Sequence, residues 1–107
     1  MIPLKKVSDL ISRHSLLEKE LASGEIDKKK FAEKSKDYSD LNEIIREIKE
    51  YYTFDKDKKD LEKIIDDKNS DKDIKELANK ELEELIKKNE KNEKKIKLFL
   101  LPKDDAD

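Results

Sequence analysis

A chain of 107 residues with half of its side chains charged, one Gly and two Pro has the composition of long α-helices, because Lys, Glu and Leu lose little rotamer freedom in a helix. Its net charge of −2 excludes a large basic field for sequence-independent binding of nucleic acid, although local contacts to RNA phosphates stay open. The absence of cysteine excludes disulfides, thiolate chemistry and Cys-based metal sites.

So much charge also raises the alternative of a disordered chain. Against disorder, 28 residues are Leu, Ile, Val or Phe, a share above the roughly 20% typical of disordered chains, and the net charge is small. No apolar run approaches the roughly 20 residues that span a bilayer, and the N-terminus lacks the apolar core of a signal peptide. The sequence therefore predicts one folded helical domain of a cytoplasmic type, with no membrane contact.

The first predicted helix spans residues 3–23. Pro3 suits a first helical turn, where its missing N–H costs no hydrogen bond. Apolar side chains follow at helical spacing, at Leu4, Val7, Leu10, Ile11, Leu17 and Leu21. Gly24 favours a left-handed helix end and Asp27 is a good N-cap for the next helix. The short link between them predicts two antiparallel neighbours.

The second predicted helix spans residues 28–67. Its apolar positions form a heptad seam, with Lys at position 34, at Phe31, Tyr38, Leu41, Ile45, Ile48 and Tyr52. Residues 53–59 are poor in apolar side chains and are the expected place of a kink if there is one. We favour a continuous helix of about 58 Å, because neither Gly nor Pro lies there to break it.

The third predicted helix spans residues 71–101. A seam at strict 4-3-4-3 spacing contains Ala78, Leu82, Leu85, Asn89, Asn92, Ile96 and Phe99. Pro102 forbids continuation and pushes Leu101 out of the helical region. The predicted fold is all-α, an antiparallel three-helix bundle in which two long helices form a coiled-coil-like hairpin. Because the first helix is short, part of that hairpin must be a two-helix arm.

No catalytic, cofactor-binding or metal-binding residue can be assigned from the sequence. His14 lies on the apolar face of the first helix without a second candidate ligand, so we assign it a packing role at the edge of the core. Asp55 and Asp57 resemble part of a calcium loop, but Asp60 stands where that loop needs Gly. A solvated helix face is the preferred interpretation. We predict a non-enzymatic chain without a cofactor.

Asn89 and Asn92 interrupt the seam of the third helix. Buried, they would fix the register of the hairpin; the alternative is that this part of the helix faces water. The aromatics Tyr38, Tyr51, Tyr52 and Phe54 fit packing between helices better than a stacking platform for RNA bases, which usually comes with basic residues in a groove. Tyr51 and Phe54 lie off the seam and are the candidates for an exposed binding patch.

Two stretches carry a resemblance to a known family. The exit Leu100-Leu101-Pro102-Lys103-Asp104, followed by an Asp-rich segment, and the run Ala78-Asn79-Lys80-Glu81-Leu82 resemble the N-terminal helical domain of the bacterial release factor 1 family of class I peptide chain release factors. Residues 31–41 agree in layout with that family's Phe…Ser…Tyr…Leu segment. By this resemblance, residues 1–101 are the helical N-terminal domain and residues 102–107 begin a linker to downstream domains.

The resemblance implies a translation termination factor that recognises UAA and UAG codons with a Pro-x-Thr loop and triggers peptidyl-tRNA hydrolysis with a Gly-Gly-Gln loop. Neither motif occurs here, since the chain has one Gly and no Gln. The implied partners are the ribosome, at the stalk base and ribosomal RNA, and the termination GTPase. The partner-binding residues are unknown, and we expect a monomer or a weak dimer. The alternative is a free-standing coiled-coil adaptor or a small chaperone-like interaction protein.

Overall fold

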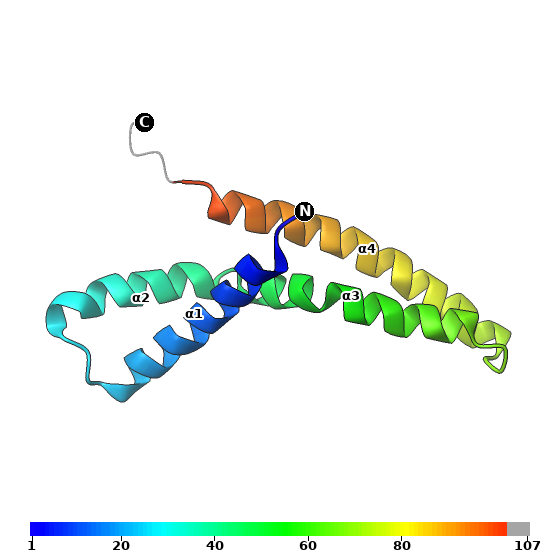
Figure 1. The fold of residues 1–107 in the computed structure, drawn as a ribbon, viewed down its shortest axis with the longest axis horizontal. Helices are drawn as coiled ribbons and strands as arrows, with labels where there is room; N and C mark the ends of the chain where they lie inside the picture. Colours follow the sequence, from blue (N-terminus) through cyan, green and yellow to red (C-terminus); the bar gives the residue numbers. More distant parts are fainter. Residues whose placement is uncertain (103–107) are drawn as a thin grey trace.

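The computed structural model describes residues 1–102, which form four helices and no strand (Figure 1). They are α1 (Leu4–Ser23), α2 (Lys28–Asn42), α3 (Ile45–Asp66) and α4 (Lys72–Leu100). The all-α class is confirmed. Leu101 is extended, as expected of a residue before proline. Most of the predicted linker, residues 103–107, lies outside the described residues.

The four helices are arranged as two hairpins that point in opposite directions from a shared centre (Figure 1). One hairpin is α1 with α2, and the other is α3 with α4. The radius of gyration is 18.6 Å, against about 13 Å for a compact domain of this size. The predicted two-helix arm is confirmed at the end of the α3–α4 hairpin that contains residues 66–71 (Figure 1).

The core lies where the two hairpins meet. Its fully buried side chains are Val7 from α1, Ile48 from α3 and Ile96 from α4. Ile2, Leu41 and Tyr51 complete the buried cluster, and half-buried apolar side chains surround it, at Leu10, Ile11, Ile44, Ile45, Phe99 and Leu100. Because these residues come from all four helices and the N-terminal segment, this single cluster holds both hairpins together.

The prediction of one continuous helix over residues 28–67 is wrong. The break lies between Asn42 and Ile45: Glu43 keeps right-handed helical angles, but Ile44 has φ −118° and ψ 0°, and its N–H bonds the carbonyl of Leu41 at 3.1 Å. The expected weak region, residues 53–59, is uninterrupted helix. Because of the break, α2 packs against α1 while α3 packs against α4. Ile44 and Ile45 at the break are both β-branched, a side-chain type that slightly lowers helix propensity.

The expected heptad seam is correct as far as Ile48, except at Phe31, which is 50% exposed, and it is wrong at Tyr52. Tyr52 is 46% exposed, whereas Tyr51 is 7% exposed and its hydroxyl accepts a hydrogen bond from the Ile2 N–H at 3.1 Å. After Tyr51 the positions of α3 that are not exposed are Phe54, Lys58, Leu61 and Ile65. Tyr51 and Phe54 are therefore packed and are not the exposed patch that the sequence suggested.

The seam predicted in α4 is confirmed. Ala78, Asn92 and Ile96 are buried, and the other members of the 4-3-4-3 series are half-buried, at Leu82, Leu85, Asn89 and Phe99. This seam faces α3 along the arm and reaches the core at Ile96. No Gly or Pro interrupts α4, so its heptad phase is preserved from end to end.

Gly24 closes α1 with φ 70°, the left-handed conformation, and no atom lies within 4 Å of the position of an added Cβ. The cost of a side chain there is therefore conformational and not steric. We expect Gly24→Ala to lower the free energy of unfolding by about 1–2 kcal/mol and Gly24→Asn by less, because Asn tolerates this conformation. Urea denaturation measures both. Equal stability of the wild type and Gly24→Ala would contradict the left-handed helix end.

Candidate functional site

His14 has the packing role that the sequence assigned to it. It is 7% exposed, its Nε2 lies 2.9 Å from the Asn42 Oδ1, and its ring stacks on Tyr38 with centroids 5.0 Å apart. The Tyr38 hydroxyl donates a hydrogen bond to Glu18 at 3.0 Å, which raises the pKa of this tyrosine. These contacts tie α1 to the last turn of α2, next to the break before α3.

The acidic residues do not assemble a metal centre in the described structure. Asp55 and Asp57 are exposed on α3, and Asp57 accepts a hydrogen bond from Thr53 at 3.1 Å. Among residues 1–102 no three His, Cys, Asp or Glu side chains gather as ligands of one ion. Within the same residues, no helix is both long and apolar enough to span a bilayer.

Asn89 and Asn92 belong to a polar layer inside the α3–α4 hairpin. Asn92 is 4% exposed and Asn89 is half-buried, so the alternative in which this part of α4 faces water is wrong. Opposite them, α3 contributes Glu47, 8% exposed, and the half-buried Glu50. Together, Glu47, Glu50, Asn89 and Asn92 form the polar layer.

Basic side chains at the rim partly neutralise this layer. Glu47 lies 3.4 Å from Arg46 and 3.8 Å from Lys95, and Glu50 forms an ion pair with Lys88. The Glu47 Oε2, Glu50 Oε1 and Asn89 Oδ1 atoms are buried without a hydrogen-bond partner among the described residues. Unpartnered buried oxygens destabilise a helix pair, so this layer weakens the arm near its base, next to the core.

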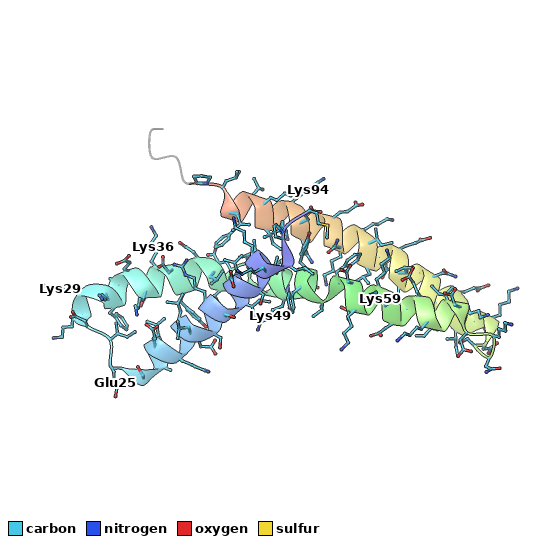
Figure 2. The ribbon with its side chains drawn as sticks, viewed as in Figure 1. Glu25, Lys29, Lys36, Lys49, Lys59 and Lys94 are labelled. Carbon is cyan, nitrogen blue, oxygen red and sulfur yellow. The ribbon has the colours of Figure 1, made fainter. Side chains whose placement is uncertain are left out.

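A second polar feature is open to solvent. The first turns of α1 and the middle of α3 border an open hollow of about 750 Å³. Its walls consist of Leu4, Lys5 and Ser8 from α1 and Tyr52, Asp55, Lys56, Lys59, Asp60 and Lys63 from α3. We call it the α1–α3 groove; Figure 2 shows Lys59 extending from α3. It contains four lysines, two aspartates and one half-exposed aromatic ring.

Sequence reasoning missed this groove because it placed Tyr52 on the buried seam. A usable signal was nevertheless present, since Tyr52, Lys56, Lys59 and Lys63 follow one another at 4-3-4 spacing and so share one helix face. The other half of the groove is brought in by α1, whose approach to α3 depends on the break at Glu43 and Ile44.

The N-terminal segment is fixed next to the groove. Glu93 Oε1 lies 3.0 Å from the Met1 α-amino group and 3.2 Å from the Lys97 Nζ. Hydrogen bonds from these two groups, the α-amino group first, lower the pKa of Glu93. With the bond from the Ile2 N–H to Tyr51, they connect the segment before α1 to both α3 and α4.

Comparison with known proteins gives one consistent result. Residues 10–107 match the PCRF domain. Peptide chain release factor 1 of Pelagibacter ubique (strain HTCC1062) is 64% identical over 107 residues, which are 100% of this chain and 30% of that protein. Peptide chain release factor 1 of Wolbachia pipientis subsp. Culex pipiens (strain wPip) is 42% identical over 106 residues, 94% of this chain and 28% of that protein.

More distant relatives carry the same description. Peptide chain release factor 1 of Alkaliphilus oremlandii (strain OhILAs) is 33% identical over 106 residues, covering 97% of this chain and 30% of that protein. No solved structure matches the chain. The chain thus spans about 30% of the length of these three curated relatives.

Proposed function

The chain belongs to the PCRF domain family, as the N-terminal domain of a release factor 1 relative, and from this premise we propose that it is the ribosome-contacting module of a translation termination factor. The resemblance carried by residues 78–82 and 100–104 is thereby confirmed at the level of the family. The observation that carries the proposal is 64% identity over all 107 residues to a peptide chain release factor 1.

The proposal assigns the chemistry of termination to parts of a longer protein. Recognition of UAA and UAG and peptidyl-tRNA hydrolysis require the Pro-x-Thr and Gly-Gly-Gln loops, and this sequence has a single Gly and no Gln. We therefore assign no catalytic step to residues 1–107. Their role is contact with the ribosome in the cytoplasm, at the stalk base and ribosomal RNA, with the termination GTPase as a further partner.

The shape of the molecule supports a contact role. The core at the centre joins two hairpins that project in opposite directions (Figure 1). The far ends of both hairpins are therefore available for contact with a partner. The α3–α4 arm has few fully buried side chains and many charged ones. A surface rich in charge suits binding to a ribosome, because complementary charges increase the rate of association.

Co-sedimentation tests this proposal. We expect the fluorescently labelled chain to pellet through a sucrose cushion with bacterial ribosomes programmed with a UAA codon in the A site, and to be displaced by an intact peptide chain release factor 1. The same sample should release no peptide from a stop-codon complex. A chain that stays in the supernatant, or that itself releases peptide, would contradict the assignment.

The coiled-coil adaptor remains a second candidate because of exposed apolar side chains on the arm. Ile64 on α3 and Ile74 and Leu77 on α4 are all exposed, near the turn that joins the two helices. An adaptor that self-associates through them would sediment as a dimer at high protein concentration. A monomer in analytical ultracentrifugation argues against this alternative and is the result that we expect for a ribosome-binding module.

A further inference from the structure

We propose that the α1–α3 groove binds a short single-stranded segment of RNA, with phosphates against its lysines and one unpaired base on the Tyr52 ring. This inference rests on the proposed function, since the RNA available to such a module is ribosomal. It goes further by giving the contact a place in the fold and a recognition chemistry. The surface combines cations with an accessible aromatic ring, the two components of sequence-tolerant single-strand binding.

The first support is the geometry of the lysines. At a rise of about 1.5 Å per residue, Lys56, Lys59 and Lys63 extend over about 10 Å of one face of α3. Lys5 faces them from α1 across the groove. Cations spread over both walls of an open hollow suit the successive phosphates of an extended backbone better than a single small anion.

The second support is that these lysines lack internal partners. None of Lys5, Lys56, Lys59 and Lys63 forms an ion pair with any other residue of the described chain, and all are exposed. By contrast, Lys34 and Lys88 pair with glutamates that lie between helices. The groove has a formal charge of +2, four lysines less two aspartates, in a chain with a net charge of −2. The groove therefore attracts anions locally.

The third support is the Tyr52 ring. Nearly half of this side chain, 46%, is exposed, while its neighbour Tyr51 contributes a buried ring to the core. It heads the lysine stripe, one turn before Lys56. An acidic protein segment would use the lysines but would gain little from this ring, whereas a base gains by stacking on it. The ring and the lysines together favour RNA as the partner.

Fluorescence anisotropy of the 107-residue chain with a labelled single-stranded RNA dodecamer of mixed sequence tests the inference. We expect binding whose logarithm falls with the logarithm of salt concentration with a slope of about −3, because each of four phosphates neutralised on a single strand contributes about −0.7. The triple variant Lys56→Gln, Lys59→Gln, Lys63→Gln should reduce the slope to about −1. Tyr52→Ala should weaken binding about 5-fold to 150-fold, and Tyr52→Phe should restore it.

Matched controls separate the groove from charge in general. Lys87→Gln, Lys91→Gln, Lys94→Gln removes three exposed lysines from α4 at similar spacing, and Phe31→Ala removes a half-exposed ring from α2; Figure 2 shows Lys94 on α4. Both should bind RNA as the wild type does, with an unchanged circular dichroism spectrum. Equal losses in the groove and control variants would overturn the inference, as would no RNA binding or a preference of the groove for polyglutamate over RNA.

The same variants in the ribosome assay distinguish this inference from the proposed function. Ribosome binding that persists unchanged when the groove lysines are replaced would overturn the groove and leave the ribosome-contacting module standing. RNA binding through the groove without any ribosome binding would support the groove and contradict the module. Loss of both activities in the groove variants alone supports both.

Discussion

Ile96→Asp is expected to abolish the cooperative unfolding transition of the chain. Ile96 is fully buried in the single cluster that joins both hairpins. Removal of a buried isoleucine side chain alone costs about 2–5 kcal/mol, and a buried unpaired carboxylate adds several more. A domain of this size has roughly 5–15 kcal/mol in total. Thermal denaturation followed by circular dichroism at 222 nm measures the effect, and Ile48→Asp should behave in the same way.

The matched control for this prediction lies on the same helix. Ile74 is 52% exposed near the start of α4, so Ile74→Asp removes far less buried surface than Ile96→Asp and adds a negative charge where the helix dipole favours one. We expect its free energy of unfolding to differ from the wild type by less than about 0.5 kcal/mol. A cooperative transition that survives Ile96→Asp would mean that the central cluster does not hold the hairpins together.

Much of the fold was predictable because α4 carries an undisturbed pattern. Its seam from Ala78 to Phe99 keeps strict heptad spacing, and burial follows it residue by residue. The end of α1 was predictable from Gly24 and that of α4 from Pro102, because each residue type restricts the backbone in a known way. These signals are local, so a single sequence suffices to interpret them.

The break between α2 and α3 could not be predicted from local signals. Residues 42–45 contain neither Gly nor Pro, and the weakly apolar stretch 53–59, which looked like the place for a kink, is regular helix. What bends the chain is tertiary packing, with α2 on α1 and α3 on α4, and the bond between His14 and Asn42 at the end of α2. Helix propensity is a weak preference that such packing overrides.

The candidate site was missed for the same reason. After Ile48 the buried face of α3 moves by one residue, so that Tyr51 is buried in place of Tyr52 and an expected seam position becomes the exposed ring of the α1–α3 groove. A stacking platform for bases needs an aromatic ring beside lysines in a groove, and the sequence does place lysines on the same helix face as Tyr52. Only the position of α1 over α3 shows that this condition is met.

The polar layer of the α3–α4 hairpin interrupts its apolar seam with buried polar groups. Glu47 and Asn92 are more than nine-tenths buried, and the Glu47 Oε2 has no hydrogen-bond partner among the described residues. Buried ionic and polar groups of this kind are often less stabilising than apolar side chains of similar volume. Asn at a core position of a helix pair can instead fix register. The layer therefore exchanges stability for a defined alignment of the arm.

The double variant Glu47→Met, Asn92→Leu is accordingly expected to be more stable than the wild type, by about 1–4 kcal/mol, because it replaces a buried carboxylate that has one unpartnered oxygen, and a buried amide, with apolar contacts. Lys95, which is exposed, can return to water when its partner is lost. Urea denaturation measures the gain. The control Glu62→Met, Asn79→Leu makes the same changes at exposed positions and should alter stability by less than about 0.5 kcal/mol. A loss of stability in the core variant would show that ordered water or the flanking basic residues satisfy the layer, and that Glu47 and Asn92 stabilise the arm as well as align it.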